Sequence, residues 1–212
     1  YRVWWWIANL IGRSYFRVKV YGAGNVPTTG AFIVSPIHRS NLDTPILALI
    51  TKRRLRYMGK ESLWKSKFGA WFLTSLGGFP VDRATADREA LRACIEVVSR
   101  GEPLVMFPEG TRQSGPTVCE MFDGPAYVAC RAQIPILPVG LGGTERAMPK
   151  GRKIPLPSRI VIVVGEPIYP PPRPDGGRVP RRQVRELTDR LRDEIQVLFD
   201  EAQALAGTPN VH

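Results

Sequence analysis

LVMFPEGTR, residues 104–112, joins a short apolar run to a loop of mixed polar and charged residues. An apolar run of this length is typical of a strand buried inside a sheet. AFIVSP (31–36), ILPVGL (136–141) and RIVIVVG (159–165) have the same character. We therefore expect these four segments to be buried strands of one sheet.

The rest of the chain alternates between strand and helix patterns. FRVKVYG (16–22), residues 56–59 and GFPVD (78–82) predict further strands. Helical spacing predicts helices over 87–100 and 183–206, and a third that begins between Asn41 and Thr44, because Pro45 fits only a first turn. This order predicts a single α/β domain with a central, largely parallel or mixed sheet flanked by helices. In such sheets, functional loops gather at the carboxyl ends of strands.

The composition indicates a folded domain with anionic partners. The chain has 212 residues, 43% of them hydrophobic, and a net charge of +11. That charge suits nucleic acid, acidic phospholipid headgroups or phosphorylated small substrates, and does not choose among them. Cys94, Cys119 and Cys130 are an odd number without C-x-x-C spacing, so we expect no disulfide framework, no metal site and a reducing compartment.

The first sixteen residues, YRVWWWIANLIGRSYF, are apolar and rich in tryptophan. The apolar run is shorter than the roughly 20 residues that span a bilayer, and it has no signal-peptide cleavage site. Trp4, Trp5 and Trp6 point in different directions around a helix, which favours the lipid headgroup boundary over simple core packing. We expect residues 1–14 to associate with a membrane. The chain starts at Tyr1 rather than Met, which leaves room for a preceding segment.

A second segment has a similar character. Four Lys and Arg residues lie between 52 and 56, and LWKSKFGAWF (63–72) then mixes lysines with Trp64, Trp71 and phenylalanines. Cations beside aromatic rings suit anionic headgroups, where each Lys or Arg contributes about 1 kcal/mol. A solvated basic face beside a core helix explains the pattern nearly as well.

HRSNLD (38–43) directly follows a predicted strand. Pro36 ends that strand, so we expect His38 on the loop that enters a helix and Asp43 in the first turn of the helix. A carboxylate there can accept a hydrogen bond from one imidazole nitrogen and leave the other free to take a proton from an alcohol. This arrangement corresponds to the histidine base and the orienting aspartate of a serine protease, but the substrate supplies the nucleophile.

Two other loops carry groups that suit an anion, FPEGTR (107–112) and the end of GGFPVDR (77–83). Glycine lets the backbone approach an anion closely, threonine offers a hydroxyl and arginine matches phosphate oxygens. The glutamate would orient arginines or hydrogen-bond a substrate hydroxyl. A surface ion pair of Asp82 with Arg83, and a turn-stabilising bridge of Glu109 with Arg112, would explain these loops without a ligand. The candidates are Arg83, Glu109, Gly110, Thr111 and Arg112.

The order HRSNLD, GGFPVDR, FPEGTR, PILPVGL (135–141) resembles the four sequence blocks of the glycerolipid acyltransferase family. Its best-known members are the 1-acylglycerol-3-phosphate, or lysophosphatidic acid, acyltransferases. The resemblance covers residues 16–170, and its first and third blocks are specific in combination. It implies that His38 is the general base, Asp43 its partner and Pro138 part of the acyl-donor site. The residues implied for the acceptor and its phosphate are Lys60, Arg83, Glu109, Gly110, Thr111 and Arg112.

The resemblance implies that residues 15–212 transfer a fatty acyl group from acyl-CoA or an acylated carrier protein to a lysophospholipid hydroxyl, in phospholipid biosynthesis. Attack would be direct, without an acyl-enzyme or cofactor, on the cytoplasmic face of a membrane. Phe79-Pro80-Val81 departs from the aliphatic-Phe-aliphatic run of many members, which leaves glycerol 3-phosphate or another lipid open as acceptor. A nucleic-acid-binding module is the alternative from another class, and we expect no nucleic acid because no such motif is present. The sequence leaves the oligomeric state open.

Overall fold

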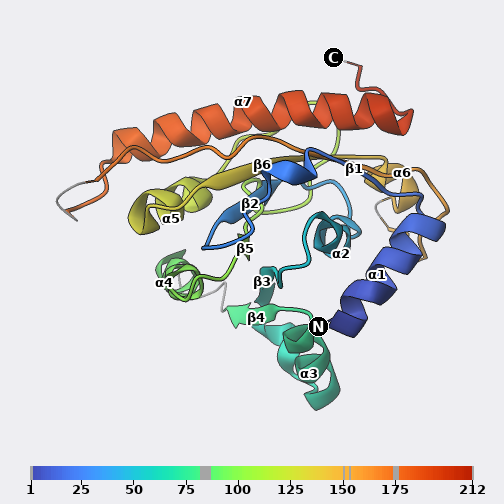
Figure 1. Ribbon diagram of the computed structural model, residues 1–212, viewed down its shortest axis with the longest axis horizontal. Helices are drawn as coiled ribbons and strands as arrows, with labels where there is room; N and C mark the ends of the chain where they lie inside the picture. The colour runs from blue at the N-terminus through green and yellow to red at the C-terminus, as the bar shows by residue number, and fades with distance from the viewer. Residues whose placement is uncertain (1, 82–86, 150, 153, 174–176, 212) are drawn as a thin grey trace.

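We describe the chain in a computed structural model, which places residues 2–81, 87–149, 151–152, 154–173 and 177–211 (Figure 1). A seven-stranded sheet has the order β1-β7-β6-β2-β5-β3-β4. β6 and β7 pair antiparallel and all other neighbours pair parallel. The expected α/β fold with a mixed sheet is therefore confirmed. The strands are β1 (Lys19–Tyr21), β2 (Ile33–Pro36), β3 (Arg56–Lys60), β4 (Gly78–Val81), β5 (Leu104–Val105), β6 (Ile136–Gly142) and β7 (Val161–Val164).

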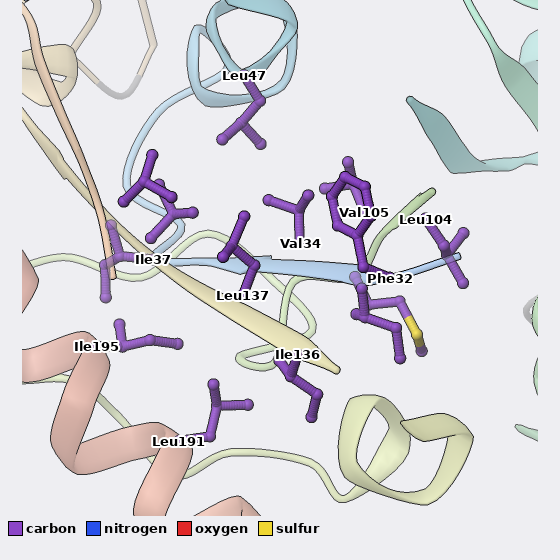
Figure 2. Packing of buried hydrophobic residues seen from close by; sticks show 14 of the residues in the cluster. Phe32, Val34, Ile37, Leu47, Leu104, Val105, Ile136, Leu137, Leu191 and Ile195 are labelled. Carbon is purple, nitrogen blue, oxygen red and sulfur yellow. The ribbon is translucent and has the colours of Figure 1, made fainter. Parts of the chain in front are cut away.

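Helices cover both faces of this sheet. Figure 2 shows Leu47 on one side of β2 and β6, and Leu191 and Ile195 of the last helix on the other. All three side chains are buried in one core with the strand residues between them. The α-helices are α1 (Arg2–Ser14), α2 (Asp43–Ile46), α3 (Lys67–Ser75), α4 (Asp87–Ser99), α5 (Gly124–Ala132), α6 (Thr144–Ala147) and α7 (Arg181–Ala206), and the 3-10 helices are η1 (Ala23–Asn25), η2 (Leu47–Ile50) and η3 (Glu61–Trp64).

The long helix α7 lies directly against the sheet. Gly140 and Gly142 alternate along β6, and a Cβ atom at either position would collide with the α7 backbone, at Leu198 and Ala202 respectively. Only glycine lets two backbones approach this closely. These two positions therefore set how closely α7 packs on β6.

The predicted elements are confirmed, with shifted ends in several places. The strand expected over 104–107 is reduced to two residues, and the helix expected from residue 183 begins at Arg181. Helix α5 was not predicted, because its first two residues, Gly124 and Pro125, resemble a turn. Proline is nevertheless tolerated in the first turn of a helix, because the N–H groups of that turn have no carbonyl partner within the helix.

Candidate active site

His38 and Asp43 meet as predicted, at the end of β2. The Nδ1 atom of His38 lies 2.9 Å from Oδ2 of Asp43. The same oxygen accepts hydrogen bonds from the backbone N–H groups of Arg39 at 2.7 Å and Ser40 at 2.6 Å. The Asp43 side chain is fully buried, so these three bonds fix both the ring and the loop that carries it.

The imidazole of His38 also lines a cavity. Its ring stacks on Phe107, with 4.0 Å between centroids and 29° between planes. Among the residues that the structure describes, none forms a hydrogen bond with Nε2 of His38. The side chain is 16% exposed and lines a large cavity, so Nε2 can meet a substrate hydroxyl. Phe107 was quoted in the sequence block but assigned no role.

Glu109 and Arg39 form a buried ion pair beneath this loop. Arg39 donates from Nη1 to both carboxylate oxygens of Glu109, at 2.9 and 2.8 Å. Glu109 also accepts hydrogen bonds from the backbone N–H groups of His38 at 3.0 Å and Cys119 at 3.1 Å. Of the two roles left open for Glu109, this geometry matches the orientation of an arginine.

Arg39 connects four parts of the chain, and the sequence analysis assigned it no role. It donates to the carbonyl oxygens of Gly115 at 3.2 Å and Thr117 at 3.0 Å. Its guanidinium also lies over the ring of Phe199 in α7, 5.1 Å from the centroid. The only sequence feature that indicated this pairing was the presence of opposite charges in two motifs, Arg39 in HRSNLD and Glu109 in FPEGTR.

The cavity that His38 lines has a volume of about 1690 Å³. One part is apolar and includes Met58, Leu91 and Cys94. Burial raises the pKa of the Cys94 thiol to about 12, so the thiol is neutral at physiological pH. Glu145 of α6 also lines the cavity, and burial raises its pKa, reinforced by Asp43 and opposed by Arg39. In the described ranges, no group of three or more His, Cys, Asp or Glu side chains is placed to hold a metal ion.

The FPEGTR loop contributes the predicted anion-binding residues to this cavity. Gly110, Thr111 and Arg112 all line it. Gly110 has a φ of 69°, in the left-handed region that favours glycine, and a Cβ there would also displace the ring of Phe122, 2.7 Å away. The loop therefore brings backbone, hydroxyl and guanidinium groups to the cavity that His38 lines.

Three other predicted residues lie elsewhere or cannot be placed. Pro138 is buried in β6, where its carbonyl accepts the N–H of Gly165 at 3.0 Å, and it is not among the residues that line the cavity. The backbone of Lys60 ends β3, but its side chain and the whole of Arg83 lie outside the described residues.

The tryptophans predicted to contact a membrane fall into two groups. Trp5 donates from Nε1 to the carbonyls of Ala48 and Thr51, and Trp64 donates to Oγ1 of Thr74, so these two rings hold their segments in place. Trp4 packs edge-on against Phe72 of α3, and Trp6 and Trp71 are exposed. Hydrogen bonds from the indole N–H thus distinguish the anchoring rings, Trp5 and Trp64, from the solvent-facing rings, Trp6 and Trp71.

Known proteins share both the sequence and the fold. Residues 17–142 match the sequence model of the Acyltransferase family. The 1-acyl-sn-glycerol-3-phosphate acyltransferase of Bacillus subtilis is 25% identical over 89% of this chain and 91% of its own length. The alpha form from Mus musculus is 27% identical over 87% of this chain and 64% of its own length.

The crystal structure of the 1-acyl-sn-glycerophosphate (LPA) acyltransferase, PlsC, from Thermotoga maritima superimposes with a TM-score of 0.72 at 26% identity. The superposition covers 91% of this chain and 78% of that one. The sequence match to the family spans more than half of the chain and includes the His38 and FPEGTR loops. This chain therefore belongs to the acyltransferase family.

Proposed function

We propose that this protein transfers a fatty acyl group from an acyl thioester to the free hydroxyl of 1-acylglycerol-3-phosphate, in phospholipid biosynthesis. The observation that carries the proposal is an imidazole that is fixed by Asp43 and lines a large cavity together with Arg112. The names of the relatives from Bacillus subtilis and Mus musculus support the choice of acceptor.

The proposed reaction is a direct displacement. Nε2 of His38 removes the proton of the acceptor hydroxyl as its oxygen attacks the thioester carbonyl carbon. The carbon–sulfur bond breaks, and the departing thiolate takes the proton from the imidazolium. Asp43 stabilises that imidazolium through Nδ1–H. No cofactor and no acyl-enzyme are required, and orientation of the two substrates supplies much of the remaining rate.

In this proposal the 110–112 loop binds the acceptor phosphate, together with Lys60 and Arg83. Arg112 is exposed at the cavity, where a guanidinium can bind phosphate oxygens in a bidentate manner. We give Glu109 a different role from the one the family resemblance implied, because both of its oxygens already bind Arg39. It orients the catalytic loop instead of contacting the acceptor.

An acyl-transfer assay tests the function. We expect purified protein with palmitoyl-CoA to acylate 1-acylglycerol-3-phosphate, detected as thiol release and as phosphatidic acid by mass spectrometry. Lysophosphatidylcholine, whose phosphate is a diester, and glycerol 3-phosphate, which lacks the acyl chain, separate the possible acceptors. If no lysophospholipid is acylated, the proposal fails. A preference for another acceptor would keep the chemistry and replace the substrate.

We also propose that the protein docks on the cytoplasmic face of a membrane through one apolar surface formed by α1, η3 and α3. The edge-on contact between Trp4 and Phe72 joins the two helices, which lie at one corner of the molecule (Figure 1). Exposed Lys65 and Lys67 flank this surface. Across the described part of the chain, no helix is long and apolar enough to cross a bilayer. The surface consists of side chains that are 57% to 74% exposed: Val3, Trp6, Leu10, Leu63, Phe68 and Trp71.

Removing the rings from this docking surface should release the protein from lipid. We expect a Trp6→Ser, Phe68→Ser, Trp71→Ser variant to bind anionic vesicles at least tenfold more weakly in a sedimentation assay. The reason is that burial of one large apolar side chain is worth about 1.5–3 kcal/mol. Tyr169→Ser is the control, because Tyr169 is 69% exposed and lies outside this surface. Equal vesicle binding by the triple variant and the native protein would exclude this docking surface.

A further inference from the structure

Four arginines gather at the end of the cavity formed by α5 and the start of α7. Arg131 lies in the last turn of α5, Arg178 precedes α7, and Arg181 and Arg185 lie one turn apart in α7. All four are exposed, and all line the same cavity as His38. We call them the arginine cluster, and they are separate from the FPEGTR loop.

Few carboxylates neutralise the positive charges of the arginine cluster. No carboxylate in the described ranges forms an ion pair with Arg131, Arg178 or Arg181. Arg185 lies 3.6 Å from Asp189 in an exposed pair that contributes little. The first turn of α7 contains no acidic residue, although the positive end of the helix dipole favours acids there. These cations therefore do not serve helix stability, and an anion with several charges would relieve their repulsion.

In the proposed function, the acceptor phosphate already has a site elsewhere in this cavity, at Gly110, Thr111 and Arg112. The arginine cluster lies on α5 and at the start of α7, whereas those three residues lie on the loop after β5. In the proposed acceptor, the phosphate lies only a few bonds from the reacting hydroxyl. One phosphate this close to the hydroxyl occupies one such site, so the arginine cluster remains for another phosphate-bearing substrate.

Resting on the proposed function, we infer that the arginine cluster binds the phosphates of coenzyme A in the acyl donor. Coenzyme A has phosphates at its nucleotide end and, at the other end of a long flexible arm, the thioester. The cavity could hold that arm between the cluster and His38. The cluster also lies on the side of the molecule opposite α1, away from the proposed docking surface (Figure 1). A water-soluble donor would reach it more readily than a lipid headgroup.

Kinetics with two donors test the assignment. The cluster variant is Arg178→Gln, Arg181→Gln, Arg185→Gln. We expect the ratio of KM for palmitoyl-CoA to KM for palmitoyl-pantetheine, which has no phosphates, to rise at least tenfold in this variant. The matched control removes three other α7 arginines that do not line the cavity, Arg182, Arg190 and Arg192, and should leave this ratio unchanged.

Direct binding separates this inference from the proposed function. By calorimetry we expect free coenzyme A to bind the native protein and the control variant, and to bind the cluster variant at least tenfold more weakly. This result would support the site even if no acyl transfer were found. Acyl transfer together with equal coenzyme A binding by all three proteins would overturn the site alone. The assignment of the arginine cluster to coenzyme A would also be overturned if the cluster variant bound free coenzyme A as the native protein does and lost affinity only for an acylated carrier protein.

Discussion

Replacing His38 with alanine lowers kcat/KM for acyl transfer by about a hundred- to ten-thousand-fold, the usual contribution of general-base catalysis. The reason is that His38 lines the cavity, and Nε2 is the ring nitrogen that the hydrogen bond to Asp43 leaves available. The rate is measured as thiol release from palmitoyl-CoA at saturating acceptor. His212→Ala, which removes the other histidine of the chain, is the control and should retain full activity.

The Asp43→Asn substitution tests the partner of His38 in the same hydrogen-bonded pair. An amide at this position can donate a hydrogen bond to Nδ1, which would place the proton on the wrong nitrogen. We expect a large fall in kcat and a smaller change in the KM of the acceptor. Activity of His38→Ala within threefold of the native protein, with an unchanged unfolding temperature, would exclude His38 as the base.

Replacing Arg39 with methionine should destabilise the protein by about 3–5 kcal/mol, because it leaves Glu109 charged and buried without its partner. The loss is measured as the free energy of unfolding in urea. The control is Arg182→Met, which breaks an exposed ion pair with Glu186 and should leave the free energy of unfolding nearly unchanged.

A double variant separates charge from packing at this site. Arg39→Met with Glu109→Leu removes both charges, so we expect it to recover part of the stability lost in the single variant. Recovery is partial because the backbone N–H groups of His38 and Cys119 lose their acceptor. If Arg39→Met cost no more than the exposed control, the buried pair would have no role in holding the catalytic loop.

The sequence predicted the features that depend on short-range patterns. The strands follow from apolar runs, and the contact of His38 with Asp43 follows from their spacing at the start of a helix. The pairing of Arg39 with Glu109 joins residues 70 positions apart, and it could be recognised only once β2 and β5 were known to be neighbours.

Long-range packing also explains what the sequence analysis left out. A tryptophan-rich helix can be assigned an exposed face only when its neighbours are known. Trp5 points inward because Ala48 of η2 and Thr51, the residue after η2, offer their carbonyl groups to its N–H, and no local pattern indicates those groups. Pro138 matches the family block, yet β6 is covered by α7, which keeps it away from the cavity.

The two glycines of β6 fix the position of α7. Because α7 backbone fills the space above Gly140 and Gly142, any axial sliding of the helix would push its side chains into the strand. Phe199, which contacts Arg39 of the catalytic loop, and Arg185 belong to that one helix, so their spacing along it is fixed. A substitution of either glycine by a larger residue would therefore shift both ends of α7 together.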